Sequence, residues 1–160
     1  MDSNNNFLSI ISALTALIAV FVGPMITLRV SNKTIISPMR QAWINNLRDL
    51  IAEFLATTEK SAFKAYIPET DIKMKKARQK IYERLFHIES KISLMINPDE
   101  TNHTDLLKAI IVLKNAEAPT MIEIESLEEG EPTNFELKQQ AVIRMSRTIL
   151  KEEWDVVKYG

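Results

Sequence analysis

The feature that most constrains this chain is a long uncharged segment close to its N-terminus. Residues 7–28 contain no Asp, Glu, Lys or Arg, and most of their side chains are apolar. An α-helix needs about 20 such residues to cross the ~30 Å hydrocarbon core of a bilayer. The segment therefore predicts a transmembrane helix over 7–28, preceded by a short external N-terminus over 1–6.

The flanks of this segment predict its retention and its orientation. No Lys or Arg precedes it, and it is longer than the apolar core of about 7–15 residues in a cleaved signal peptide. Basic residues that follow within about 15–20 positions mark the cytoplasmic side of a span. These juxtamembrane residues are Arg29, Lys33, Arg40 and Arg48. We therefore expect a single-pass protein whose N-terminus is outside and whose C-terminal domain is cytoplasmic.

Small residues recur on one face of the expected span. The residues of this small-residue seam follow one another at spacings of 3, 4, 3 and 4: Ser9, Ser12, Ala16, Ala19 and Gly23. Small side chains let helix backbones approach closely in a membrane, and serine hydroxyls can donate across the contact. Small residues are also common in membrane helices, so a seam can arise by chance. The pattern favours a helix–helix interface, either with a second copy of the chain or with another membrane protein.

The rest of the chain predicts an all-α fold, with about four helices beyond the span. A juxtamembrane linker over 29–37 is expected to lead into a cytoplasmic helical domain over 38–160. Apolar periodicity and helix-breaking prolines place its helices at about 38–65, 70–96, 104–117 and 133–158. Short connections between amphipathic helices favour a small antiparallel bundle.

Short signals indicate where these helices begin and what separates the last two. Ser37 followed by Pro38 is typical of an N-cap and a first helical position. Thr133 and Glu136 have the spacing of a capping box. Between the third and fourth helices, residues 117–132 contain six glutamates and no basic residue. This composition predicts a long acidic loop, with at most a short turn or strand-like piece packed on the core.

Apolar stripes at helical spacing identify the expected core. In the first cytoplasmic helix the stripe is Trp43, Leu47, Leu50 and Phe54; in the second, Ile81, Leu85, Ile88, Ile92 and Met95; in the last, Phe135, Val142, Met145, Ile149 and Val156. Trp154 is expected on the flank of the last stripe. Trp43 can occupy either a membrane interface or the core, and we favour the core.

Charge is unevenly distributed along the chain. Residues 29–98 contain 13 basic and seven acidic residues, and residues 99–160 contain seven basic and 13 acidic residues. The first turns of the second helix carry a basic face: Lys73, Lys75, Lys76, Arg78 and Lys80. Such a face can bind nucleic acid, but few aromatic residues accompany it, so nucleic acid is not an expected partner. Lipid headgroups or the acidic half of the same fold are the expected contacts, if these are not simply solvated helix faces.

The sequence contains no recognisable catalytic motif. There is no cysteine, and no glycine-rich phosphate loop or nucleophile elbow is present. His87 and His103 each have a carboxylate close in sequence, but a metal site usually needs three or four ligands. We interpret both as polar surface groups. We therefore expect no enzyme activity, no cofactor and no metal site.

The block from Arg40 to Phe54, which includes Trp43 and Arg48, resembles a segment of other proteins. It is similar to the block that follows a membrane span in small, uncharacterised bacterial and phage-associated proteins. The similarity covers the span and the first cytoplasmic helix. It implies a location in the cell inner membrane and carries no assigned activity.

These observations predict a membrane-anchored, non-enzymatic interaction or scaffold protein that presents a helical domain at the cytoplasmic face. Its expected partners are the lipid bilayer and either a second copy of the chain or a membrane partner protein. The alternative is an oligomerising membrane effector, of toxin or phage-defence type, that perturbs the bilayer. The uncharged span counts against a constitutive ion channel. A signalling module that moves the bundle in response to its span also fits.

Overall fold

The computed structural model describes residues 3–65, 72–128 and 130–159. Every regular element within these ranges is a helix, which confirms the all-α prediction. Side chains are outside the description in parts of some helices, namely at 3–10, 28–29, 31–33, 63–65, 121 and 159. The first two residues of the expected external segment and the expected start of the second helix, 70–71, also lie outside the described residues.

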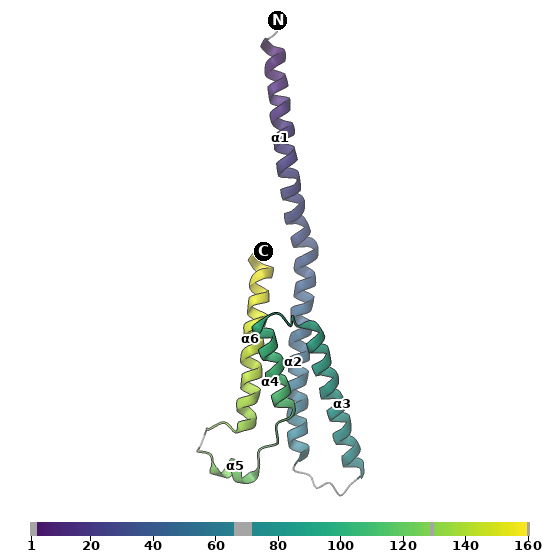
Figure 1. Ribbon diagram of the computed structural model, residues 1–160, viewed down its shortest axis with the longest axis vertical. Helices are drawn as coiled ribbons and strands as arrows, with labels where there is room; N and C mark the ends of the chain where they lie inside the picture. The colour runs from purple at the N-terminus through teal and green to yellow at the C-terminus, as the bar shows by residue number, and fades with distance from the viewer. Residues whose placement is uncertain (1–2, 66–71, 129, 160) are drawn as a thin grey trace.

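The N-terminal part of the chain forms one continuous helical rod (Figure 1). It consists of α1 (Ser3–Ser31), a π-helical segment η1 (Asn32–Ile36) and α2 (Ser37–Ala65). The prediction of a separate linker over 29–37 is therefore wrong. Ser37 is an interior residue of the rod and not an N-cap, because helical turns precede it without a break.

The π-helical segment has a local cause in Pro38. A proline lacks the N–H that would bond the carbonyl four residues earlier, and its ring crowds that carbonyl. Here the crowded residue is Thr34, which lies inside η1. A π turn is wider than an α turn, so it accommodates the ring while the helix continues. The hydroxyl of Thr34 donates to the carbonyl oxygen of Val30 at 2.7 Å, which adds a bond across the junction.

Four of the helices form the antiparallel bundle that the sequence predicts. They are α2, α3 (Ile72–Met95), α4 (Thr101–Lys114) and α6 (Asn134–Tyr159). In Figure 1, α2 and α4 run away from the α1 end and α3 and α6 run back towards it. Contacts join α2 to α3 and α6, and join α4 to α3 and α6. The third helix begins and ends three residues earlier than expected, because Asn115 already caps its C-terminus.

The predicted acidic loop contains a short helix, α5 (Met121–Ser126). Thr120 caps it by accepting a hydrogen bond from the N–H of Glu123 at 3.1 Å. The Glu123 carboxylate accepts in turn from the N–H of Asn134 at 3.1 Å, at the start of α6. The capping box of α6 is confirmed, since the Thr133 N–H donates to Glu136 at 2.8 Å and the Glu136 N–H donates to Thr133 Oγ1 at 3.2 Å.

The core lies between α2, α3, α4 and α6. Its fully buried side chains come from all four helices and include Leu47, Phe54, Leu85, Ile88, Ile92, Leu106, Ile110, Leu113, Val142 and Ile149. Burial of each such side chain contributes roughly 1.5–3 kcal/mol relative to exposure. Trp43 packs against this core, and its indole N–H donates to the carbonyl oxygen of Met95 at 3.0 Å. Val156 is the exception to the predicted stripes, because α6 extends beyond α4 and leaves it exposed.

Polar contacts link neighbouring helices at the surface of the bundle. Arg84 of α3 donates to Glu53 of α2 at 2.6 Å. Lys114 of α4 pairs with Glu89 of α3 at 2.5 Å, and Arg40 of α2 pairs with Glu153 of α6 at 3.1 Å. An exposed pair such as Arg84–Glu53 is worth about 0–1 kcal/mol, whereas the Lys114–Glu89 pair is mostly buried. These pairs fix which helix faces meet more than they stabilise the fold.

Candidate functional site

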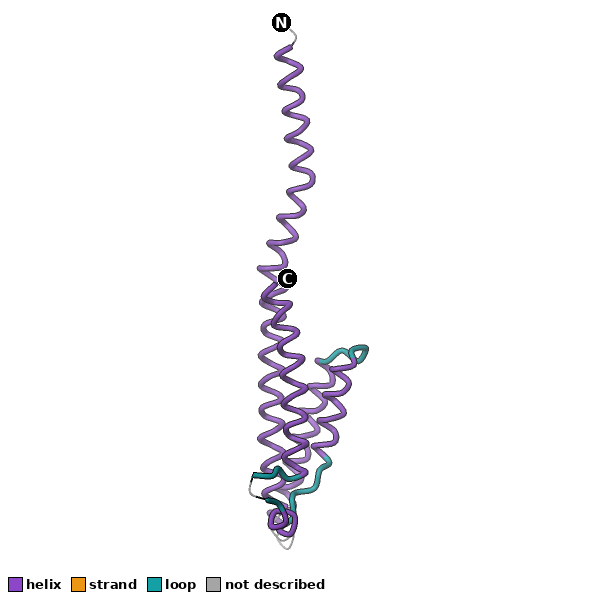
Figure 2. The backbone as a smooth tube through the Cα atoms, turned by 90° about the vertical axis from the view of Figure 1, so that its left-hand side faces the viewer, coloured by secondary structure: helices purple, strands orange, loops and turns teal. Residues whose placement is uncertain are grey.

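The first candidate site is α1 itself, because it projects beyond the bundle. Figure 1 and Figure 2 both show it extending away from the other helices, with the N-terminus at its far end. Its neighbouring element is η1, which continues the same rod. The other helices of the bundle therefore leave the sides of α1 uncovered.

The uncovered surface of α1 is apolar on all sides. Every described side chain from 11 to 27 is exposed, and none of them is charged. Large residues are included, with Leu17 at 61% and Phe21 at 68% relative exposure. Proteins that work as soluble monomers rarely expose apolar patches larger than a few hundred Å². We therefore expect another molecule to cover the apolar surface of this helix.

Two threonine hydroxyls of α1 are bonded inside the helix. The hydroxyl of Thr15 donates to the carbonyl oxygen of Ile11 at 2.9 Å, and that of Thr27 donates to Gly23 at 2.9 Å. Pro24, inside the same helix, has no N–H to donate to the carbonyl oxygen of Val20, so one backbone hydrogen bond is absent there. Hydroxyls that are bonded within a helix can enter a medium without water.

The small-residue seam is uncovered in the single chain. Ser12, Ala16, Ala19 and Gly23 are all exposed, and a Cβ added at Gly23 would meet no atom within 4 Å. The side chain of Ser9 lies outside the described residues. The backbone can therefore be approached closely along this face, as a helix–helix contact requires.

Exposed apolar residues continue below α1, at the junction with the bundle. Ile35 and Ile36 of η1 and Met39 of α2 are exposed, as are Trp154 (45%) and Val156 at the end of α6. The Arg40–Glu153 pair holds the end of α6 beside the start of α2. We call these five exposed residues the junction patch; its two members on α6, Trp154 and Val156, lie on different sides of that helix because they are two positions apart. Sequence reasoning missed it, because the patch depends on which helix lies beside the rod.

The juxtamembrane basic residues separate into two groups. The side chains of Arg29 and Lys33 lie outside the described residues. Arg40 is bound to Glu153, and Arg48 donates to Asn45 of its own helix at 3.3 Å. The latter two therefore belong to the bundle surface.

The predicted basic face on α3 lies far from α1. Lys73, Lys75, Lys76, Arg78 and Lys80 occupy the first turns of α3, and Figure 1 places these turns at the end of the bundle opposite α1. Lys75 and Arg78 line a cleft there, whose wall also includes Glu117 from the acidic half of the chain. Lys76 and Lys80 do not line it.

His103 differs from its sequence interpretation as a polar surface group. It lies in the first turn of α4 and is only 3% exposed. Its Nδ1 accepts from the N–H of Asn97 at 3.0 Å, and its ring stacks on Trp43 with the centroids 6.3 Å apart. This cluster holds the α3–α4 turn against α2. Over the described residues no three potential metal ligands come together.

The structure describes side chains for only part of the expected span, because those of residues 7–10 and 28 are not among the described ones. Over the part of the chain that the structure describes, no helix combines the length and the hydropathy required to cross a membrane. No family model matches the chain, and neither a curated protein nor a solved structure matches it.

Proposed function

We propose that α1 inserts into the bilayer of the cell inner membrane and holds the helical bundle at its cytoplasmic face. The observation that carries this proposal is the exposure of every described side chain from 11 to 27, all of them uncharged, on a helix that no other described part of the chain covers. A lipid bilayer covers such a helix on all sides. A protein partner would need to enclose it completely to do the same.

The proposed orientation follows from the charges and from the geometry of the rod. An α-helix rises about 1.5 Å per residue, so Arg40 lies about 18 Å and Arg48 about 30 Å beyond residue 28. Both distances exceed the Debye length of about 8–10 Å in physiological salt. Arg29 and Lys33 are therefore the residues that reach the headgroups and set the orientation.

The same geometry removes one expected role of the basic face on α3. The 24 residues of α3 span about 36 Å, and the basic face is at its far end. Lipid headgroups of the membrane that holds α1 are out of its reach. The junction patch, and not this basic face, is the part of the bundle nearest to the bilayer; Trp154 follows Glu153, the partner of Arg40, and so lies at about the level of that arginine.

Within this arrangement, the protein acts as a non-enzymatic interaction protein. The small-residue seam offers a contact within the membrane and the junction patch offers one at its surface. A second copy of the chain and a different membrane protein both fit the seam. Because both surfaces lie on the rod or beside it, one partner can contact them together.

The uncovered seam also supports a second candidate function, an oligomerising effector that perturbs the bilayer. Several copies of α1 packed through small residues would form an assembly within the membrane. Ala16→Leu with Ala19→Leu should abolish crosslinked oligomers in native membranes, whereas Leu14→Ala with Ile18→Ala on the other face should not. Unchanged oligomers in the first variant would show that the seam is not used.

A membrane-potential dye separates the two functions. Expression of an oligomerising effector should depolarise cells, and Ala16→Leu with Ala19→Leu should restore the potential. Expression of an interaction protein should leave the potential unchanged while the oligomer or partner contact is intact.

The anchoring proposal is tested by cysteine labelling, which the cysteine-free chain makes direct. Asn5→Cys should react with a membrane-impermeant maleimide in intact spheroplasts. Asn46→Cys, on an exposed position of α2, should react only after the membrane is opened. Labelling of both positions in intact spheroplasts, or extraction of the protein by alkaline carbonate, would overturn the proposal.

A further inference from the structure

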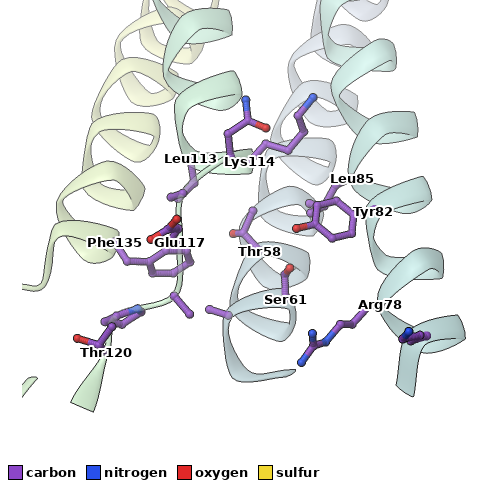
Figure 3. A pocket seen from close by; sticks show the side chains of 16 residues that line it. Thr58, Ser61, Arg78, Tyr82, Leu85, Leu113, Lys114, Glu117, Thr120 and Phe135 are labelled. Carbon is purple, nitrogen blue, oxygen red and sulfur yellow. The ribbon is translucent and has the colours of Figure 1, made fainter. Parts of the chain in front are cut away.

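A cleft of about 850 Å³ opens at the end of the bundle opposite α1. Figure 3 shows its walls: α2 and α3 on one side, and the end of α4 with the following connection on the other. Its volume lies in the range of small-molecule sites, which is roughly 300–1,000 Å³. Nothing in the anchoring function uses this cleft.

Three cationic side chains from two helices line the cleft. Lys75 and Arg78 lie on one face of α3, and Lys114 reaches across from the end of α4. Lys114 pairs with Glu89, so one of its three donors is engaged. Lys75 is exposed and makes no ion pair within the described residues. Arg78 is half-buried at the lower end of the cleft, where its side chain extends from α3.

The other residues that line the cleft provide hydroxyl groups and an apolar floor. Ser61 of α2 and Tyr82 of α3 bring hydroxyls to the cleft. The Tyr82 ring is 59% exposed and points into the space between α2 and α3 (Figure 3). Leu85 and Leu113 form a buried floor. Such a wall offers an aromatic face and apolar contact beside the cations.

The charge and the size of the cleft favour an anion that also carries an organic group. Glu117 is the one carboxylate among the described lining residues, against three cations. Lys114 is engaged by Glu89 and Arg78 also has a partner, but an ammonium and a guanidinium group each carry further N–H donors. Lys and Arg side chains together bind phosphate by charge-assisted hydrogen bonds. An inorganic ion would fill only a small part of the volume, so the ligand also needs an organic part that contacts Tyr82 and the floor.

We propose that this cleft binds a phosphate-bearing small molecule of nucleotide size. Its phosphate lies against Lys75 and Arg78, and its ring or apolar body lies against Tyr82 and the floor. The inference does not depend on the membrane function, because the cleft belongs to the bundle alone. It places a ligand site at the far end of the rod from the proposed anchor.

The test measures binding of ATP and of inorganic phosphate to the full chain in phosphatidylcholine nanodiscs, by calorimetry. ATP should bind saturably at or below about 1 mM, the range of common metabolite affinities. Phosphate alone should bind more weakly. Lys75→Gln with Arg78→Gln should weaken ATP binding by about tenfold or more, since each lost charge-assisted contact removes a strong hydrogen bond.

The chain offers a matched control on the same helix. Lys76→Gln with Lys80→Gln removes the same charge outside the cleft, and should change ATP affinity by less than about twofold. Tyr82→Ala, at an exposed position that the fold tolerates, should weaken ATP binding and leave phosphate binding unchanged. Phosphatidylglycerol added to the nanodiscs should not displace ATP, which distinguishes a free phosphate compound from a lipid headgroup.

Three results would overturn the proposal. The first is no saturable ATP binding at these concentrations. The second is an equal loss in both double variants, which would indicate non-specific attraction to a basic helix. The third is preferential binding of a single-stranded oligonucleotide with both double variants impaired, which would indicate an extended nucleic-acid surface.

Discussion

Two helices of equal length and opposite environment lie end to end in one rod. Both α1 and α2 contain 29 residues. Every described side chain of α1 from 11 to 27 is exposed, whereas α2 buries one face, including Leu47 and Phe54, and packs against α3 and α6. The backbone is helical in both, so the difference lies in how apolar residues are distributed around the helix. A helix with one apolar stripe packs against a neighbouring helix. A helix that is apolar on all sides needs an apolar environment all around it.

The largest expected effect comes from making α1 resemble α2. Leu17→Lys with Val20→Lys places two charges at the centre of the proposed span and should cost about 6 kcal/mol of insertion free energy. The variant should leave the membrane fraction after an alkaline carbonate wash. Ala42→Lys with Asn46→Lys, at exposed positions of α2, should remain bound. Retention of the α1 variant in the membrane fraction would contradict the proposed difference between α1 and α2.

The next effect tests the packing of α2. Phe54→Ala removes a fully buried ring and should lower the free energy of unfolding of the bundle by about 3–5 kcal/mol. Urea unfolding in detergent, followed by the fluorescence of Trp43 and Trp154, measures it. Phe21→Ala removes the same ring from α1 and should change this free energy by less than about 0.5 kcal/mol. A comparable loss in both variants would mean that α1 packs on the bundle.

A smaller effect compares two threonines. Thr133→Ala removes the hydroxyl that caps α6 and should lower the unfolding free energy by about 1 kcal/mol. In Thr15→Ala the lost hydroxyl bonded only within α1, so the unfolding midpoint of the bundle should stay the same. The same denaturation assay reports both variants, and an unchanged midpoint in Thr133→Ala would contradict the observed capping box.

The smallest effect concerns the contact that aligns the rod with α6. Arg40→Gln breaks the half-exposed pair with Glu153 and should cost up to about 1 kcal/mol in low salt. The cost should vanish near 1 M salt, where charges are screened over roughly 3 Å. Arg48 donates to Asn45 of its own helix, so Arg48→Gln should not measurably change the free energy of unfolding. A salt-independent loss in Arg40→Gln would indicate packing and not charge.

Much of the fold follows from the sequence, because its signals are local. The stripes of α2 and α3 have spacings that only a helix places on one face, and Thr133 with Glu136 marks the start of α6. The separate linker was wrong because Ser37 and Pro38 fit both a helix start and a proline absorbed by a π turn. Helix α5 was missed although Thr120 and Glu123 have the same spacing as the capping box of α6.

The candidate sites were predictable only where one helix carries them. The uncharged character of 7–28 is visible in the sequence, and the structure leaves its described part uncovered. The junction patch and the distal cleft each need several segments to meet. Lys75 and Lys76 are adjacent in sequence, yet only Lys75 lines the cleft. That distinction depends on where α2 and α4 lie beside α3, which no local pattern contains.

The unbroken passage from α1 through η1 into α2 gives the molecule a mechanical lever. A rigid shaft converts a small angular change at one end into a displacement at the other. Its arm from residue 37 to residue 65 is about 43 Å long, so a change of roughly 10° in the tilt of the span would sweep the far end sideways by on the order of 7 Å. Under the anchoring proposed above, the tilt of α1 in the bilayer and the position of the cleft would then change together.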